Sequence, residues 1–257
     1  MPDTMASRSI PDRLRIPQYP RSSAYDSDWL LENMMGPNPL WLTESLLDHM
    51  ALQSGDRVLD LGCGKALSSI FLARETGAQI AAVDLWIPAE ENRERIAAAG
   101  LTDRIDAIHA DARSLPFDDE SFDALVSVDA FHYFGTEAAA LAAVLRVLRH
   151  GGRMGIVVPG LTREAPWPQH LEPWWEDGFA TFHGAGWWRE HLVASGLVRV
   201  DRTDMVPAGH EHWLRWASIA DDWAAARGKE PYRREVAMLS ADHEPLLGFV
   251  RVIARKL

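Results

Sequence analysis

The chain has 257 residues, of which 47% are hydrophobic and 25% are charged, as in ordinary globular proteins. With 26 Lys and Arg against 37 Asp and Glu, its net charge is -11, which disfavours nucleic acid as a partner. One cysteine, Cys63, excludes an internal disulfide framework and favours a reducing, cytoplasmic location. No apolar run approaches the roughly 18 residues of a membrane span, and residues 1–20 lack the apolar stretch of a secretory signal.

The N-terminal region predicts an irregular segment followed by a helix. Residues 1–24 are rich in Pro, Arg, Ser and Asp and show neither a helical nor a strand period. We therefore expect residues 1–37 to form an irregular lead-in or lid. Asn38 and Pro39 are typical of a helix start, with Asn as the N-cap and Pro in the first turn.

Residues 55–159 alternate between short apolar runs and helical patterns. The runs predict strands at 57–61, 79–84, 105–110, 122–128 and 153–158. The intervening segments predict helices at 66–74, 89–99 and 136–149, the last ended by Gly151 and Gly152. Short buried strands separated by helices are typical of a parallel sheet, and right-handed crossovers make it a doubly wound α/β sheet.

Beyond Pro159 the regular alternation stops. The later pattern predicts a helix at 187–195, a strand at 197–205, a helix at 210–227 and a last strand at 247–254. The third of these is expected to bury one stripe of side chains, namely Trp213, Trp216, Ile219, Ala220 and Trp223. We interpret residues 1–257 as a single domain with helical cap insertions at 160–186 and 208–246.

Polar and glycine residues follow the predicted strands, where an open parallel sheet binds its ligands. The first strand ends in Asp60-Leu61-Gly62-Cys63-Gly64, whose glycines let the backbone approach a ligand closely. Asp84 ends the second strand, 22 residues beyond Gly62, where a carboxylate can accept hydrogen bonds from both ribose hydroxyls. Asp111-Ala112 follows the third strand, and Asp129 follows the fourth.

A dinucleotide site is one interpretation of this glycine loop. Such a site requires a third glycine, but Leu67 occupies that position. Asp60 would also place a negative charge near a pyrophosphate, whereas it suits a cationic ligand. These residues disfavour a nicotinamide-dependent oxidoreductase, which we keep as an alternative.

The residues after four successive strands resemble those of the class I S-adenosylmethionine-dependent methyltransferases. The resemblance spans about residues 40–160 and rests on Val58–Ala66, Asp84, Asp111-Ala112 and the segment after the fourth strand. His109-Ala110-Asp111-Ala112, Leu115-Pro116-Phe117-Asp118 and Phe122-Asp123 resemble the small-molecule branch with the quinone and sterol C-methyltransferases. The resemblance implies a seven-stranded, mostly parallel, Rossmann-like sheet whose last strand is antiparallel.

The resemblance also implies S-adenosylmethionine as cofactor and a set of residues that bind it. Asp60 would lie near its methionine part, the glycine loop would line it, Asp84 would hold the ribose, and Asp111 and Ala112 would contact the adenine. Many members carry a third glycine where this chain has Ala66. The full expected set is Tyr25 as a lid residue, Asp60, Gly62, Cys63, Gly64, Asp84, Leu85, Trp86, Asp111, Ala112 and Asp129.

Methyl transfer from a sulfonium mainly requires alignment of the reacting atoms, which can supply roughly 7–11 kcal/mol. A general base adds about 10²–10⁴-fold, and only where the acceptor is protonated. His132 is the first candidate base because imidazole titrates near neutrality; the alternative is that it is a packed or cofactor-orienting residue flanked by Phe131 and Tyr133. Tyr133 is a candidate for positioning the acceptor, and His183 is a second candidate base.

Aromatic residues supply the candidate acceptor site. Phe131, Trp174, Trp175 and Trp187 are expected to form an aromatic wall for an apolar or planar acceptor, the alternative being that they pack the cap onto the sheet. His210-Glu211-His212 invites a metal interpretation, but side chains at i and i+2 diverge on a helix. No third ligand is evident, and no metal is expected.

We therefore predict an S-adenosylmethionine-dependent methyltransferase that moves a methyl group to a small, apolar or aromatic acceptor by in-line displacement. A non-catalytic, cofactor-gated binding module is a further alternative. The expected partner is a small-molecule acceptor, with no nucleic acid and no membrane span, and the chain is expected to be a monomer or a homodimer.

Overall fold

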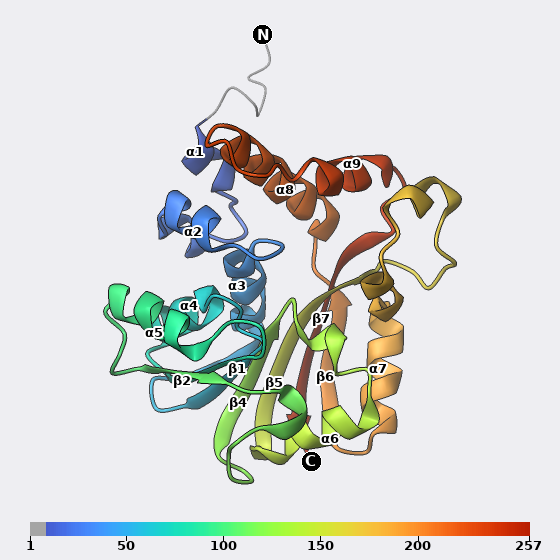
Figure 1. The fold of residues 1–257 in the computed structure, drawn as a ribbon. Coiled ribbons are helices and arrows are strands. Elements are labelled where there is room, and N and C mark those ends of the chain that lie inside the picture. The colour runs from blue at the N-terminus through green and yellow to red at the C-terminus, as the bar shows by residue number, and fades with distance from the viewer. Residues whose placement is uncertain (1–8) are drawn as a thin grey trace.

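The computed structural model of the chain describes residues 9–257 and is built around a seven-stranded sheet. The strand order is β3-β2-β1-β4-β5-β7-β6, and only β7 runs antiparallel to its neighbours. The strands are β1 Arg57–Leu61, β2 Gln79–Asp84, β3 Ile105–His109, β4 Phe122–Val128, β5 Leu148–Leu161, β6 Val198–Met205 and β7 Leu247–Lys256 (Figure 1). This confirms the predicted mostly parallel, Rossmann-like sheet with an antiparallel last strand.

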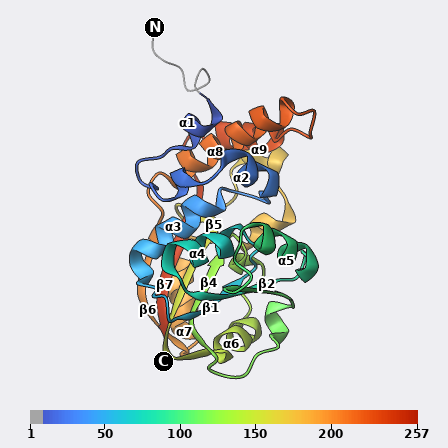
Figure 2. The ribbon, with the colours of Figure 1, turned by 90° about the vertical axis from the view of Figure 1, so that its left-hand side faces the viewer.

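Helices cover both faces of the sheet (Figures 1 and 2). The α-helices are α1 Ile10–Leu14, α2 Ser27–Asn33, α3 Pro39–Met50, α4 Leu67–Thr76, α5 Ala89–Ala98, α6 Ala138–Arg146, α7 Ala185–Ala194, α8 Gly209–Ala225 and α9 Arg233–Ala241. Helices α3, α4 and α5 share one core layer with the strands, and α6 and α7 share the other. Because side chains alternate along a strand, Val58 of β1 lies in the first layer and Leu59 in the second.

The N-terminal prediction needs correction. The segment is not irregular throughout: α1 and α2 are helical, and Ser22–Ala24 (η2) forms a 3₁₀ turn. Asp26 caps α2 by accepting from the Trp29 backbone N–H at 2.7 Å. This N-cap is a helix-start signal that a prediction from overall composition does not use. Residues 1–8 of the expected lead-in lie outside the described residues.

The predicted helix 136–149 is also wrong at both ends. Helix α6 ends at Arg146, and β5 already begins at Leu148, which pairs with Phe122. The Gly151-Gly152 pair therefore falls within the irregular start of a long strand, not at a helix end. Strand pairing across the sheet, which no local pattern encodes, extends β5 in both directions.

A second group of helices stands over the carboxyl ends of the parallel strands (Figures 1 and 2). Helix α8 contacts α1 and α9, and all five members of its predicted stripe are buried. The Trp223 indole N–H donates to Asp28 on α2 at 2.8 Å, and Arg13 pairs with Asp222. Helix α8 thus ties α1 and α2 to the late part of the chain, and α9 was missed by sequence reasoning.

The segments expected as cap insertions hold η5 (Gln169–Trp174), η6 (Asp177–Thr181), α8 and α9. Strand β5 continues to Leu161, so the first insertion begins after the predicted boundary at residue 160. None of the helices within residues 9–257 is long and apolar enough to span a membrane.

Candidate cofactor-binding site

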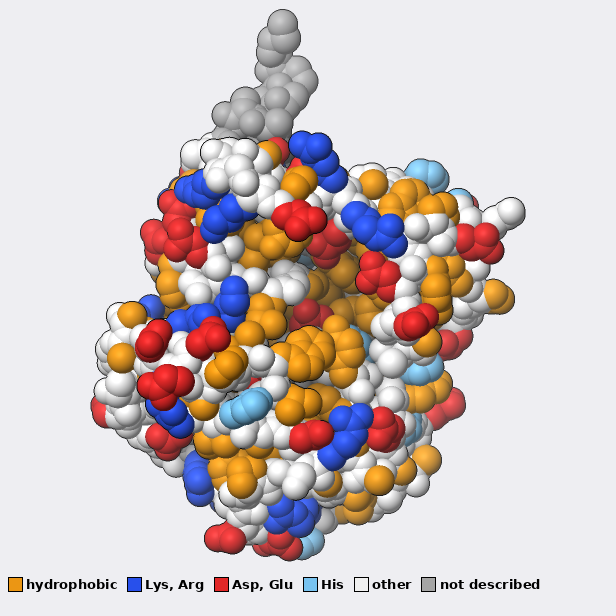
Figure 3. All heavy atoms as spheres, viewed as in Figure 1, with side chains coloured by type: hydrophobic (Ala, Val, Ile, Leu, Met, Phe, Trp, Pro, Cys, Tyr) orange, Lys and Arg blue, Asp and Glu red, His pale blue; other side chains and the backbone are white. Residues whose placement is uncertain are grey.

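A deep crevice lies at the carboxyl ends of β1, β2 and β4, between the sheet and the overlying N-terminal segment. Its empty volume is about 1170 Å³, part of it open to solvent. Figure 3 shows this face hollowed between the two groups of elements, with hydrophobic side chains around the hollow. The walls come from Asn33, Met35–Pro37, Pro39, Leu61–Lys65, Leu67, Ser68, Val83–Trp86, Ala110–Arg113, Val128–Ala130, Tyr133 and Phe134.

The glycine loop after β1 forms the floor of the crevice. Gly62 and Gly64 have φ angles of 75° and 53°, a region that favours glycine. A Cβ at Gly62 would collide with the Ala130 methyl group, and one at Gly64 would lie 2.9 Å from the Met35 sulfur. The missing side chains let Ala130 and Met35 pack against the loop, and Gly62, Cys63 and Gly64 line the crevice as a backbone cradle.

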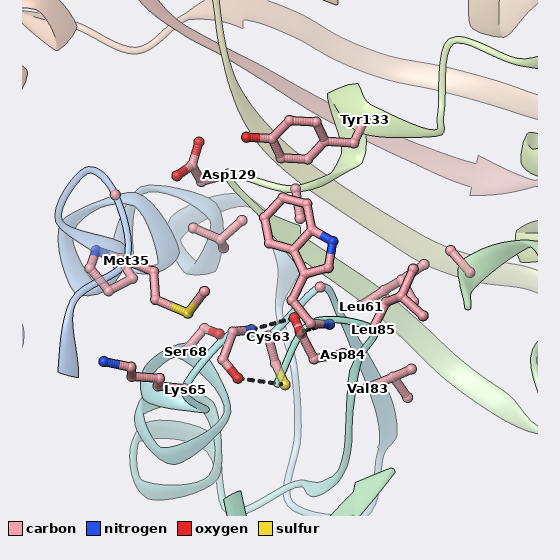
Figure 4. A pocket seen from close by; sticks show the side chains of 18 of the residues that line it. Met35, Leu61, Cys63, Lys65, Ser68, Val83, Asp84, Leu85, Asp129 and Tyr133 are labelled. Carbon is pink, nitrogen blue, oxygen red and sulfur yellow. Dashed lines mark hydrogen bonds between the residues drawn. The ribbon is translucent and has the colours of Figure 1, made fainter. Parts of the chain in front are cut away.

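Asp84 connects the two loops that follow β1 and β2. One carboxylate oxygen accepts from the Gly64 N–H at 2.8 Å, and the other accepts from the Trp86 and Ile87 N–H groups at 2.8 and 2.9 Å (Figure 4). A carboxylate offers about four acceptor sites. Asp84 thus retains capacity for about one ligand hydroxyl, fewer than the two that the sequence suggested.

The loops after β2 and β3 supply further residues of the predicted cofactor wall. Leu85 and Trp86 are 48% and 64% exposed, as expected for an apolar surface that awaits a ligand. Asp111 accepts from the Arg113 backbone N–H at 2.8 Å, and Ala112 lies beside it in the wall. The structure therefore brings these predicted residues together in one crevice.

Asp60 lies behind the glycine loop, not in the crevice wall. It is fully buried and accepts hydrogen bonds from Ser68 and Ser69 at 2.7 and 2.6 Å. Burial raises its pKa to about 6, although both serine hydroxyls act in the opposite direction. Cys63 does line the crevice, and burial, with the charges of Asp60 and Asp84 adding, raises the pKa of its thiol well above the usual range.

Asp129 and Tyr133 face each other across the upper part of the pocket (Figure 4). Asp129 directly follows β4 and has a φ of 54°, which aims its side chain into the crevice. Burial, with the charge of Glu235 adding, raises the pKa of Asp129 to about 8. Burial and the Asp129 charge also raise the pKa of the Tyr133 hydroxyl.

His132 and Phe131 do not reach the crevice. They share the 3₁₀ turn η4 (Phe131–Tyr133) with Tyr133, and successive side chains on such a turn point about 120° apart. Phe131 packs against Trp188 in the core. His132 is 1% exposed, its Nδ1 has no partner among the described residues, and burial lowers its pKa to about 4.

The predicted cap residues also lie outside the crevice wall. Trp187 stacks on His183 at 3.6 Å between ring centroids, so each ring covers one face of the other. Trp175 packs against Trp167, and Trp174 lies against the core. The aromatic-wall assignment therefore has no support from the crevice geometry, because packing of the cap uses these rings.

Tyr25 is likewise held away from the crevice. Its hydroxyl donates to Glu75 on α4 at 2.9 Å, and its ring packs against Phe71. The N-terminal wall is formed instead by Asn33, Met35, Gly36, Pro37 and Pro39, which sequence reasoning missed together with Lys65. The Asn38-Pro39 helix start was the available signal, since it marks where the segment before α3 ends.

No cluster of three or more potential metal ligands occurs within residues 9–257. The His210 ring instead lies 3.2 Å from the Leu247 carbonyl oxygen. The site is a crevice with a backbone cradle, a loop-bracing carboxylate and an apolar wall, which fits a nucleoside-containing ligand.

Comparison with known proteins decides the family. Residues 58–152 match the family described as methyltransferase domain. Residues 58–152 are therefore identified as a class I S-adenosylmethionine-dependent methyltransferase domain. The chain resembles the small-molecule branch of these methyltransferases, with S-adenosyl-L-methionine as the methyl donor of the family.

Two curated relatives and one solved structure illustrate the similarity. The chain is 26% identical to 27-O-demethylrifamycin SV methyltransferase of Amycolatopsis mediterranei, over 84% of this chain and 82% of that protein. It is 38% identical to demethylmenaquinone methyltransferase of Clavibacter sepedonicus, over 52% of this chain and 53% of that protein. It spans about half the length of several other curated relatives. The cyclase SpnF shares the fold, with a TM-score of 0.68, 23% identity and coverage of 87% and 83%.

Proposed function

We propose that this chain transfers the methyl group of S-adenosylmethionine to a small organic acceptor by in-line displacement. The observation that carries the proposal is the single crevice shared by the Gly62–Gly64 cradle, Asp84 and the Asp129–Tyr133 pair. The cradle and Asp84 suit the cofactor. Asp129 and Tyr133 face each other across the pocket, where an acceptor would lie beside the cofactor (Figure 4).

When bound, the cofactor supplies an activated methyl group, so the protein has to bind, orient and exclude water. Asp84 is suited to hold a ribose hydroxyl while it braces the glycine loop. Leu85 and Trp86 would offer apolar surface to the adenine ring of the cofactor. Asp111 and Ala112 line the same crevice and would contact the edge of that ring. Alignment of acceptor, methyl carbon and sulfur can supply roughly 7–11 kcal/mol of the barrier.

The acceptor we propose is apolar or aromatic. Met35, Pro37, Tyr133 and Phe134 give the crevice an apolar wall. The two relatives described above are methyltransferases of demethylrifamycin SV and demethylmenaquinone by name. We propose that the chain acts in the cytoplasm as a monomer or a homodimer, without nucleic acid as substrate.

A thermal-shift panel with S-adenosylmethionine, S-adenosylhomocysteine, NAD⁺ and NADH tests the cofactor. We expect the first two alone to raise the Tm, by mass action on the folded state. Transfer of a labelled methyl group into metabolite extracts of the native host then tests the reaction. Stabilisation by the nicotinamide cofactors would favour the oxidoreductase. Binding without transfer to any extract would favour the cofactor-gated binding module.

A further inference from the structure

The Asp129 carboxylate is the one strongly polar group on the acceptor side of the crevice that has no bonding partner within residues 9–257. Only its backbone N–H is engaged, with the Val157 carbonyl at 2.8 Å. Gly36 makes room for it, since a Cβ at Gly36 would collide with the carboxylate. The loop conformation, with a φ of 54°, holds this side chain toward the pocket at the cost of backbone strain.

The charges around Asp129 are uncompensated. Glu235 on α9 adds a negative charge, and its own carboxylate accepts from the Trp213 indole N–H at 2.6 Å. Tyr133 on η4 offers a hydroxyl, and Glu176 adds a further negative charge near Tyr133 and Glu235. No arginine or lysine faces Asp129 from these elements.

The two cations of the crevice wall are directed elsewhere. Arg113 pairs with Glu137 at 2.8 Å. In Figure 4 the Lys65 side chain lies on the α4 side of the pocket, with Met35 between it and Asp129 in this view. A positive charge brought into the crevice by a ligand is therefore the natural counter-charge for Asp129.

We propose that Asp129 takes the proton of the methyl acceptor. We also propose that the protonation of Asp129 follows the charge of the cofactor, being ionised beside the cationic sulfonium and protonated beside the neutral thioether. Binding of the cationic sulfonium drives the proton off Asp129, which leaves a carboxylate beside the acceptor. The acceptor heteroatom then bonds to the methyl carbon as the carbon–sulfur bond breaks, its electron pair staying on sulfur. The acceptor proton passes to Asp129, and the neutral thioether product leaves that proton in place.

This inference rests on the proposed function and assigns the base to Asp129, since the crevice does not reach His132. It also gives the acceptor a chemical class, namely a molecule whose nucleophilic oxygen or nitrogen carries a proton that it must lose. Tyr133, which faces Asp129, is suited to hold the same heteroatom by a hydrogen bond (Figure 4).

The proposal can be tested without the acceptor, by isothermal titration calorimetry of S-adenosylmethionine and S-adenosylhomocysteine in buffers of different ionisation enthalpy. The slope of the observed enthalpy gives the number of protons released. At pH 7 we expect the wild type to release up to one proton more than Asp129→Asn on binding S-adenosylmethionine, and no more than the variant on binding S-adenosylhomocysteine. The ligands' own amino groups titrate in both proteins and cancel in this difference.

The pH dependence gives a second readout. Below pH 8, the wild-type preference for S-adenosylmethionine over S-adenosylhomocysteine should rise with pH relative to that of Asp129→Asn, by up to about tenfold per pH unit. Glu235→Gln removes the neighbouring negative charge, so Asp129 should ionise more readily and fewer protons should be released. Asp118→Asn, a carboxylate-to-amide change on the exposed surface outside the crevice, is the matched control and should behave as the wild type.

Asn is well suited to the left-handed conformation at position 129, so the variant should fold. Equal proton release by the wild type and Asp129→Asn would overturn the inference while leaving the methyltransferase proposal intact. Failure of the wild type to bind either nucleoside would overturn the proposed function and this inference with it.

Discussion

Replacement of Asp84 by Asn tests whether one carboxylate both braces the glycine loop and holds the cofactor. Whichever way the amide is turned, its NH₂ group faces either the Gly64 N–H or the N–H groups of Trp86 and Ile87. At least one hydrogen bond to a charged acceptor is lost, which costs about 1.5–3 kcal/mol. For a chain of this size, about 2–4 °C per kcal/mol predicts a fall in Tm of about 3–12 °C.

The cofactor should lose a similar increment because the remaining acceptor capacity of Asp84 is the part that reaches the crevice. A loss of about 1.5–3 kcal/mol corresponds to roughly 10- to 150-fold weaker binding, at 1.36 kcal/mol for each factor of ten. Calorimetric titration with S-adenosylhomocysteine measures the affinity, and thermal unfolding without ligand measures the stability. Asp106→Asn, at an exposed position on β3 outside the crevice, is the matched control.

Two results would contradict this reasoning in different ways. Unchanged affinity in a destabilised Asp84→Asn protein would mean that the carboxylate braces the loop but does not hold the cofactor. Unchanged stability would mean that the three backbone hydrogen bonds contribute little, and the bracing role would have to be abandoned.

Three further predictions follow from the backbone and the charges. Gly62→Ala should lower stability by about 2–5 kcal/mol and abolish cofactor binding in calorimetry, because the left-handed backbone costs roughly 1–2 kcal/mol and collision with Ala130 adds overpacking. Ala66→Gly should change the free energy of unfolding by less than about 1 kcal/mol in denaturant titration. Glycine relieves the backbone strain at a φ of 60°, which offsets its larger backbone entropy cost on folding and the loss of the buried Ala66 methyl group. Burial alone would raise the pKa of Asp204, but arginines such as Arg251 lower it to about 2. Wild-type stability should therefore fall between pH 4 and 2, as Asp204 becomes protonated. In acid unfolding, Asp204→Asn should show a smaller fall over this range.

The floor of the crevice was predictable because local chemistry defines it. The strands β1, β2 and β4 have the bounds that their apolar runs predict, and the acid or glycine that ends each run stands at the crevice edge. Parallel pairing then brings Gly62, Asp84 and Asp111 together without further information.

The side of the crevice toward the acceptor was not predictable in the same way. Whether His132 or Tyr133 faces the pocket depends on a rotation of about 120° along a single 3₁₀ turn, which carries no sequence period. Tyr25 and Met35 are both apolar residues of the N-terminal segment, and only packing against α4 decides that Tyr25 bonds Glu75 while Met35 lines the pocket.

The residues that shape the acceptor side come from both ends of the chain and are tied together by α8. The Trp216 indole N–H donates to the Gly36 carbonyl at 2.8 Å, and Gly36 in turn lies against Asp129. Helix α8 also bonds Glu235 through Trp213. Asp129 lies within residues 58–152, which match the family domain, whereas Gly36, Trp216, Trp213 and Glu235 all lie outside them. A change on the buried stripe of α8 would therefore move the walls around Asp129 and leave the glycine loop in place, so cofactor binding and acceptor choice can vary independently in this fold.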